Sequence, residues 1–250
     1  MKQPLFFVMF SLFTSLLSMG VVAGGNGVVL DTADIQLDDR EAIQRGAKLF
    51  VNYCLNCHSA SLMRYSRIAR DLGMSDEEIS RQLITTGAKV GETMEVVILE
   101  EDAKRWFGMA VPDLSVIARA RGVDWLYTYL RSFYRDESRP WGVNNSVFKD
   151  VGMPHVLWEL QGLQAPVMES HTDAQGNTSE VIRGFTLIEK GALNTAEYDA
   201  AVRDLVTFLA YLGEPSKLQR LALGKWVLLF LVGLLVLTFL LKKEYWRDIH

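Results

Sequence analysis

The sequence predicts a mainly α-helical domain with a small two-stranded β insertion and one membrane-spanning helix near the C-terminus. Three observations support this fold class. Apolar residues recur at helical spacing over 39–53 and 197–212. Short apolar runs between 156 and 188 flank a polar turn at 173–177, which is typical of a β-hairpin. Residues 226–241 form an uncharged apolar run.

The first 23 residues have the three parts of a secretory signal peptide. Lys2 supplies the charged start, 5–17 the apolar centre, and the small residues up to Ala23 the cleavage site. The apolar centre is short for a membrane span, so an uncleaved anchor helix is the weaker alternative. We therefore predict a signal peptide over 1–23 and one exported domain over 24–216.

The last part of the chain, residues 217–250, predicts a transmembrane anchor and a short cytoplasmic tail. The apolar stretch 221–241 is long enough to cross a bilayer. Basic residues lie on both sides of it, so charge alone does not orient the span. The signal peptide does orient it, because export of the middle of the chain leaves the tail inside. A buried core helix is the less favoured alternative.

Acidic and basic residues are unevenly divided along the chain. All but two of the 30 acidic residues lie in 24–216, whereas six of the 26 basic residues follow residue 216. An exported domain this acidic is a poor partner for nucleic acid or anionic lipid and suits a cationic protein partner. Ordinary solubility explains the same net charge equally well.

The helices expected at 39–53 and 197–212 are the first and last of the exported domain, and they should pack across each other. Gly46 leaves room for a close crossing. Gly213 and Pro215 are expected to end the second helix.

Further helices are expected between these two. The apolar pattern predicts them at 60–72, at 76–85 and within 113–134. Ser75 and Glu78 have the spacing of a capping box at the start of the second one.

Both cysteines of the chain lie in the segment Cys54-Leu55-Asn56-Cys57-His58. Two thiols three residues apart, followed directly by a histidine, are the attachment signature of a c-type haem. Each sulfur can form a thioether to one haem vinyl group, and the imidazole of His58 then lies beneath the iron. Because the motif uses both cysteines, none remains for a disulfide.

Other interpretations of this motif are weaker. A structural zinc site needs four ligands, and the other histidines, at 155, 171 and 250, show no ligand spacing. A thioredoxin-like redox pair follows a strand, whereas a helix is expected before Cys54. A disulfide between Cys54 and Cys57 would be strained. A redox dithiol is the strongest of these alternatives.

The second axial ligand decides what the iron does, because a strong protein ligand suits electron transfer and an open position permits binding of oxygen or peroxide. Met109 and Met153 both lie beside glycine and proline residues that stiffen a loop. Met153 is slightly favoured because Pro154 fixes its backbone. The residues alone leave both possible. Weaker candidates are Met63, Met74, Met94, Met168, His155 and His171.

Four further motifs follow the haem signature in order: Trp106-Phe107-Gly108, Pro112-Asp113-Leu114-Ser115, Arg119-Ala120-Arg121 and Gly152-Met153-Pro154. Together with the C-terminal anchor, they resemble the bacterial form of the cytochrome c1 family, the haem subunits of quinol:cytochrome c oxidoreductase (bc1) complexes. The resemblance covers almost all of the chain after the signal peptide. It implies a class I cytochrome c-like domain with one covalent haem c, located in the periplasm and anchored in the bacterial inner membrane.

The resemblance also implies roles for individual residues. Met153 would be the sixth ligand of the iron, Pro112 would line the haem pocket, and Arg121 would pair with a haem propionate. The chain departs from the family at Val111, where a proline is frequent. It also lacks a disulfide found in some bacterial relatives, so packing is expected to hold the loop before Met153.

The implied function is electron transfer by a subunit that is not an enzyme on its own. It would pass one electron from a Rieske iron–sulfur protein to a soluble or membrane-bound cytochrome c, beside cytochrome b. The acidic segment 92–102 lies where the family tends to carry acids for cytochrome c docking. Alternatives are an anchored c-type cytochrome of another respiratory chain, a haem peroxidase with an open sixth site and, more remotely, a disulfide reductase without haem.

Overall fold

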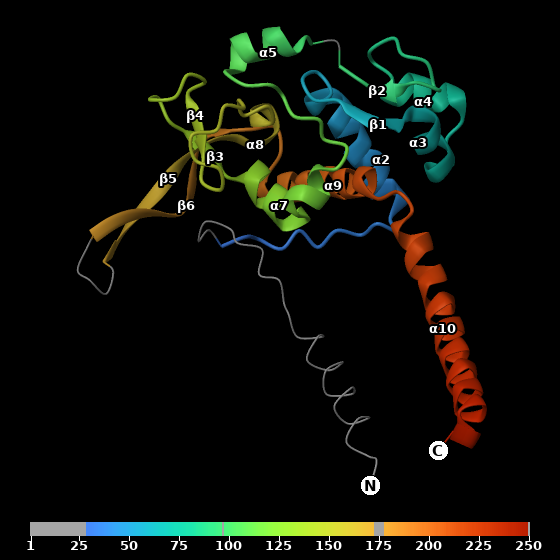
Figure 1. The fold of residues 1–250 in the computed structure, drawn as a ribbon. Helices are drawn as coiled ribbons and strands as arrows, with labels where there is room; N and C mark the ends of the chain where they lie inside the picture. The colour runs from blue at the N-terminus through green and yellow to red at the C-terminus, as the bar shows by residue number, and fades with distance from the viewer. Residues whose placement is uncertain (1–28, 97, 173–177, 250) are drawn as a thin grey trace.

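The computed structural model describes residues 29–96, 98–172 and 178–249. The predicted signal peptide and the turn expected at 173–177 lie outside these residues. Helices dominate the described part, and three two-stranded antiparallel sheets accompany them (Figure 1). The elements are α2 (Arg40–Leu49), the π-helix η1 (Phe50–Cys54), β1 (Ala60–Arg64), α3 (Tyr65–Leu72), α4 (Asp76–Leu83), β2 (Thr93–Met94), α5 (Glu100–Phe107), α6 (Ile117–Arg121), α7 (Val123–Arg131), β3 (Phe133–Arg135), β4 (Val143–Asn145), α8 (Trp158–Gln161), β5 (Gly162–Thr172), β6 (Thr178–Lys190), α9 (Thr195–Gly213), α10 (Lys217–Tyr245) and the 3-10 helix η2 (Arg247–Ile249).

The first and last helices of the domain, α2 and α9, pack across each other as predicted. Their backbones approach closely at Gly46, where a Cβ atom would lie 2.0 Å from the backbone oxygen of Asp204. The Nε atom of Arg45 donates to the same residue's carboxylate at 2.6 Å. Beside the crossing, the rings of Phe50 and Phe208 pack with their centroids 5.4 Å apart. The hydrophobic core is built around this crossing.

The helix predicted at 60–72 is wrong for its first five residues, which form strand β1. The backbone N–H groups of Ser61 and Leu62 donate to side-chain oxygens of Asp113 and Ser115. These side chains hold the chain extended, and β1 pairs with β2. The helix therefore begins only at Tyr65.

Three other predicted helices exist with different bounds. The segment 113–134 contains two helices, α6 and α7, separated at Gly122, whose φ of +89° is outside the helical range. The helix expected at 76–85 ends at Leu83, and its capping box between Ser75 and Glu78 is confirmed. The helix expected at 39–53 widens into the π-helix η1 before the haem motif.

The predicted β insertion is confirmed as the hairpin of β5 and β6, which projects from the side of the domain (Figure 1). Its strands pair antiparallel from Gly162 opposite Lys190 to Thr172 opposite Thr178. The side-chain amide of Gln164 donates to the backbone oxygen of Phe133 at 2.7 Å and joins the base of the hairpin to β3.

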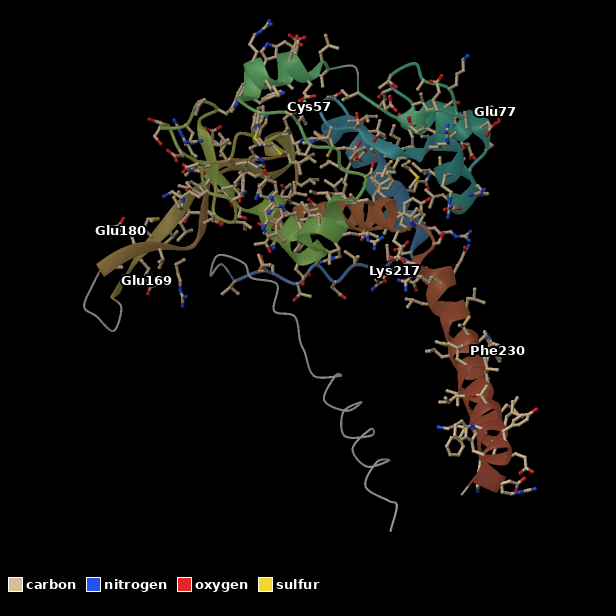
Figure 2. All side chains as sticks on the ribbon, viewed as in Figure 1. Cys57, Glu77, Glu169, Glu180, Lys217 and Phe230 are labelled. Atoms are coloured by element: carbon tan, nitrogen blue, oxygen red, sulfur yellow. The ribbon has the colours of Figure 1, made fainter. Side chains whose placement is uncertain are left out.

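The C-terminal helix α10 has 29 residues and is long and apolar enough to cross a membrane. Figure 2 shows its side chains, with Lys217 where the helix leaves the domain and Phe230 along its exposed length. None of its described residues is buried within the protein. This confirms the prediction of a single apolar helix at the C-terminal end.

Only three residues separate α9 from α10, and side chains brace this junction. The guanidinium of Arg67 on α3 donates to Ser216 Oγ at 3.4 Å and pairs with Asp71. The hydroxyl of Tyr211 on α9 donates to the same Asp71 at 2.9 Å. On the other side, Arg220 pairs with Glu214. Among the described residues, these contacts connect α3 and α9 to the start of α10.

Candidate functional site

A cavity of about 240 Å³ lies between the turn that carries the two cysteines, the segment after α5, helix α7 and the loop before α8. Its wall is almost entirely apolar. The main lining residues are Tyr53, Cys54, Cys57, His58, Phe107, Met109, Pro112, Leu114, Ile117, Arg121, Trp125, Leu126, Tyr129, Leu130, Phe148, Val151, Met153, Val156, Leu205 and Leu209. Every residue that the sequence assigned to the cofactor site is in this group.

The motif 54–58 forms a tight turn at the end of η1. The backbone oxygen of Cys54 accepts hydrogen bonds from the N–H groups of Cys57 at 3.0 Å and His58 at 2.8 Å. The two cysteines form no disulfide with each other. Burial, with a smaller contribution from Cys57, raises the pKa of the Cys54 thiol to about 12. The turn places both thiols and the imidazole at one wall of the cavity.

The imidazole of His58 is oriented by the backbone. Its Nδ1 atom lies 2.8 Å from the carbonyl oxygen of Pro112, which can only accept a hydrogen bond. The proton therefore sits on Nδ1, and the lone pair of Nε2 is left for a metal. Burial lowers the pKa of His58, which favours the neutral imidazole that a metal requires.

The segment 112–115 acts as a clamp along the haem motif. Besides the carbonyl of Pro112, the N–H of Leu114 donates to the backbone oxygen of Ser59 at 2.8 Å. Asp113 accepts from the N–H groups of Ser61 and Ser115, both within 2.9 Å. Burial acts to raise the pKa of Asp113, but these hydrogen bonds outweigh it and lower the pKa. This clamp gives the Pro-Asp-Leu-Ser motif a structural role in holding His58.

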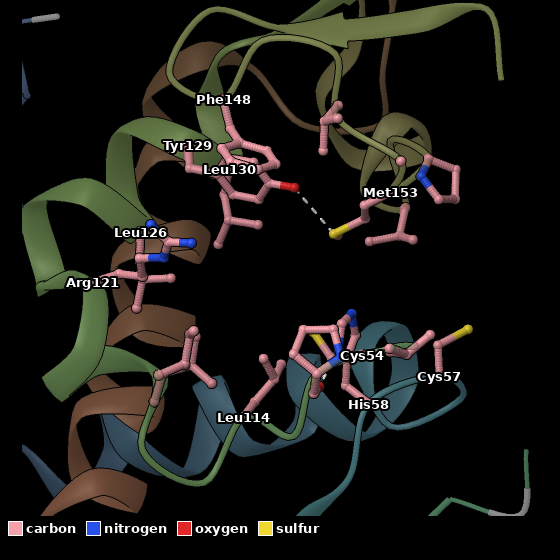
Figure 3. A pocket seen from close by; sticks show the side chains of 18 of the residues that line it. Cys54, Cys57, His58, Leu114, Arg121, Leu126, Tyr129, Leu130, Phe148 and Met153 are labelled. Carbon is pink, nitrogen blue, oxygen red and sulfur yellow. Dashed lines mark hydrogen bonds between the residues drawn. The ribbon is translucent and has the colours of Figure 1, made fainter. Parts of the chain in front are cut away.

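Met153 lies across the cavity from His58 (Figure 3). Its sulfur accepts a hydrogen bond from the hydroxyl of Tyr129 at 3.3 Å. Met109 also lines the cavity, but its side chain is 53% exposed. Among the described residues, Met109 and Met153 are the methionines that line the cavity.

The weaker ligand candidates lie elsewhere. Met63 and Met94 are buried in the core, and Met168 is exposed on the hairpin. His155 is buried and stacks on Phe133, with centroids 4.9 Å apart, outside the cavity wall. Met74 also lies away from the cavity, and the side chain of His171 is outside the described part of the structure.

Arg121 lines the cavity at the end of α6, beside two aromatic rings. Its guanidinium carbon lies 5.1 Å from the ring centroid of Trp125 and 5.9 Å from that of Phe148. No carboxylate of the described residues forms an ion pair with it. A guanidinium held in this way can bind an anionic group in the cavity.

Packing contributes to holding the loop before Met153, because Val147 and Val151 are buried in the core, and buried hydrogen bonds add to it. The side-chain oxygen of Asn145 accepts from the N–H groups of Val147 at 2.9 Å and Phe148 at 3.1 Å. Its amide donates to the backbone oxygen of Tyr129 at 2.8 Å. The neighbouring Asn144 accepts from the N–H groups of Asn145 and Asp150 in the same way.

Sequence reasoning did not single out Tyr129, Trp125 or Phe148 as cavity residues. A signal for the first two was present, because Arg121, Trp125 and Tyr129 follow each other at four-residue intervals. This spacing places side chains on one face of a helix, here continued across the break at Gly122.

The acidic segment lies near the cavity but outside it. Glu100, Glu101 and Asp102 occupy the first turn of α5, which ends at the lining residue Phe107. Ala103 is the one buried residue of this helix. Glu101 is exposed, whereas Glu100 pairs with Lys104 at 2.7 Å and Asp102 with Arg105 at 3.6 Å on the surface beside the cavity.

Comparison with known proteins gives three informative relatives and one family. Residues 34–102 match the model of the Cytochrome C1 family. A cytochrome c1 of Allochromatium vinosum is 48% identical over 95% of this chain and 97% of its own length. A protein of Nitrosomonas europaea named ammonia monooxygenase gamma subunit is 52% identical over 91% of this chain and 92% of its own. A cytochrome c1 of Rhodospirillum rubrum is 24% identical over 84% and 83%.

Proposed function

Because the chain belongs to the cytochrome c1 family, we propose that its cavity holds one haem c, attached through Cys54 and Cys57, with His58 and Met153 as the axial ligands. Cytochrome c1 is the membrane-anchored electron-transfer haem subunit of the bc1 complex. The family therefore accounts for a haem cofactor and for electron transport, and α10 is a fitting anchor. The covalent attachment and the axial ligands rest on the residues of the cavity.

The donor set fits a c-type haem. Two free thiols, an imidazole with its Nε2 lone pair available and a thioether sulfur surround one apolar cavity. When bound, the haem supplies a reversible one-electron couple. Cys54 and Cys57 would tether it, His58 and Met153 would ligate its iron, and Arg121 would bind a propionate. A methionine ligand and an apolar wall favour the ferrous state and so raise the reduction potential.

The observation that carries this proposal is the placement of Met153 opposite His58. The test is the Met153→Leu substitution in the detergent-solubilised full-length protein, with Met109→Leu as its matched control. We expect Met153→Leu to retain covalent haem, lower the potential and allow carbon monoxide to bind the reduced form. Met109→Leu should leave all three properties unchanged. A potential that falls only in Met109→Leu would transfer the ligand role to that residue.

We further propose that the protein carries one electron from the Rieske iron–sulfur protein to a cytochrome c, as a subunit that performs no bond chemistry itself. The proposal includes a domain organisation with 1–23 as signal peptide, 24–216 as a periplasmic class I cytochrome c-like domain and 217–250 as the anchor and tail; the apolar helix α10 supports the anchor. The carboxylates on the first turn of α5 would steer a cationic cytochrome c at low salt. Anchoring replaces free diffusion of the haem domain by local delivery.

The relative named ammonia monooxygenase gamma subunit favours a second candidate, an anchored one-electron relay that serves a different oxidoreductase. The haem site would be the same in both cases, and the partner complex would differ. Purification of the native protein in mild detergent separates them. Cytochrome b and the Rieske protein should co-purify with it under the first proposal, and their absence would favour the second. A peroxidase with an open sixth site is disfavoured by the position of Met153.

A further inference from the structure

One residue of the loop that carries Met153 has a left-handed backbone conformation. Asp150 has a φ of +61° and is one of two non-glycine residues with a positive φ in the part of the chain that the structure describes. Residues with a side chain rarely adopt this conformation, although aspartate tolerates it better than most. Contacts with the surrounding structure are therefore needed to hold Asp150 in it.

Asp150 lies within the ligand loop, which we define as residues 148–153. Phe148 and Met153 line the cavity from the two ends of this loop (Figure 3). Asp150 does not line the cavity, and its side chain is 57% exposed. A return of Asp150 to a right-handed conformation would redirect the residues that follow it. The sulfur of Met153 would then leave its position opposite His58.

The guanidinium of Arg139 binds Asp150 from outside the cavity. Its Nη2 atom donates to the backbone oxygen of Asp150 at 2.9 Å, and its Nη1 atom lies 3.2 Å from the carboxylate of the same residue. A planar guanidinium suits this double contact, because its donors have a fixed geometry. An ion pair with so exposed a carboxylate stabilises little, so the hydrogen bond to the backbone oxygen is the more important contact.

A second residue near Arg139 completes the set of contacts. The side-chain oxygen of Asn144 accepts from the N–H of Asp150 at 2.9 Å, so both backbone polar groups of Asp150 have partners. Asn144 is buried, and its amide donates to the carboxylate of Asp136 at 2.9 Å. The backbone N–H of Arg139 donates to the backbone oxygen of the same Asp136 at 3.1 Å. Arg139 and Asn144 are thus fixed to each other through one turn.

We propose that Arg139 is a positioning residue that holds the ligand loop in place and so keeps Met153 on the iron. The inference rests on the proposed haem site and adds to it a residue outside the cavity wall. Without Arg139, the left-handed conformation of Asp150 loses two of its contacts, and the sulfur leaves the iron more often. An added ligand binds the iron only while the sulfur is away, so its affinity measures this equilibrium.

The test measures imidazole binding to the ferric form of the full-length haem-loaded protein in detergent. We expect Arg139→Gln to raise the imidazole affinity about tenfold, which corresponds to about 1.4 kcal/mol and to the loss of about one charge-assisted hydrogen bond. The sulfur-to-iron charge-transfer band and the potential should change little, because the bound sulfur still predominates. Arg139→Lys keeps the charge without the planar fork and should raise the affinity about threefold.

The matched control is Arg135→Gln. Arg135 lies on the neighbouring strand β3 and pairs with Glu137 at 2.8 Å rather than with the ligand loop. Its imidazole affinity should equal that of the unaltered protein. Two substitutions of Asp150 test the backbone conformation separately. Asp150→Ala and Asp150→Gly both lose the carboxylate, but only alanine resists a positive φ, so Asp150→Ala should raise the affinity about threefold more than Asp150→Gly.

Three results would overturn the proposal: an unchanged imidazole affinity in Arg139→Gln, an equal rise in Arg135→Gln, or a lower potential in Arg139→Gln without a rise in affinity. The last result would mean that Arg139 acts through its charge alone. An affinity of Asp150→Ala no higher than that of Asp150→Gly would exclude the role of the left-handed conformation.

The double variant Met153→Leu/Arg139→Gln shows whether Arg139 acts through the sulfur. With no sulfur to displace, its imidazole affinity should equal that of Met153→Leu, and a further rise would contradict the proposal. Failure of the haem site itself gives a different signature. In that case Met153→Leu would leave the charge-transfer band and the potential unchanged, whatever Arg139→Gln does.

Discussion

The close crossing of α2 and α9 makes Gly46→Ala the sharpest test of the fold. An alanine inside a helix is intrinsically better than glycine by about 1 kcal/mol. The new Cβ atom, however, would lie 2.0 Å from the backbone oxygen of Asp204 and 2.8 Å from the Cβ of Phe208. Neither atom is the end of a flexible side chain, so the helices themselves must separate.

Overpacking of this kind costs about 1–3 kcal/mol, and here the rigid backbone contact places it at the upper end. After subtraction of the gain in helix propensity, we expect Gly46→Ala to lower the free energy of unfolding by about 2 kcal/mol. Separation of the helices would also move Leu205 and Leu209, which line the cavity from α9. The haem spectrum should therefore change together with the stability.

The assay is denaturant unfolding of the haem-loaded protein followed by circular dichroism. Gly91→Ala is the control, because a Cβ atom at Gly91 meets nothing within 4 Å. Its unfolding midpoint should be nearly that of the unaltered protein. A Gly46→Ala variant as stable as the unaltered protein, or more stable, would refute the argument that the crossing distance depends on this glycine.

Two further predictions concern the loop and the surface. Asn145→Ala leaves the buried N–H of Val147 without its partner and should lower the free energy of unfolding by about 2–3 kcal/mol. It should also weaken the sulfur-to-iron charge-transfer band. An unchanged band would show that Met153 is held independently of Asn145. The rate of electron transfer to a cationic cytochrome c should fall with added salt, and it should fall at low salt when Glu100, Glu101 and Asp102 are replaced by their amides. Replacement of the hairpin acids Glu169 and Glu180 should leave this rate unchanged, whereas a rate insensitive to salt would remove the docking role of α5.

Sequence reasoning predicted the features that depend on local chemistry. The crossing of the terminal helices follows from two long apolar patterns and one glycine. The capping box of α4 is likewise contained within four residues. In these cases the interacting residues are close in the chain, or their spacing in the sequence is typical of one secondary structure.

The features that could not be predicted depend on distant partners. Residues 60–64 have an apolar pattern compatible with a helix, but Asp113 and Ser115, more than 50 residues away, take the hydrogen bonds of their backbone. Tyr129 has the helical spacing of a core residue. Its hydroxyl contacts the sulfur of Met153, which belongs to a separate loop, so the spacing within the helix does not reveal this contact. Asn145 has no sequence signal, because its three partners belong to two separate segments.

The braced junction between α9 and α10 has a mechanical consequence for the proposed relay. Helix α9 forms part of the cavity floor and passes, after three residues, into the membrane helix. Arg67, Asp71 and Tyr211 link α3 and α9 to that passage, so a haem bound as proposed would stay close to the membrane. Under the proposed function, this short connection would limit how far the haem domain can move from the membrane, so its donor and acceptor would have to approach it.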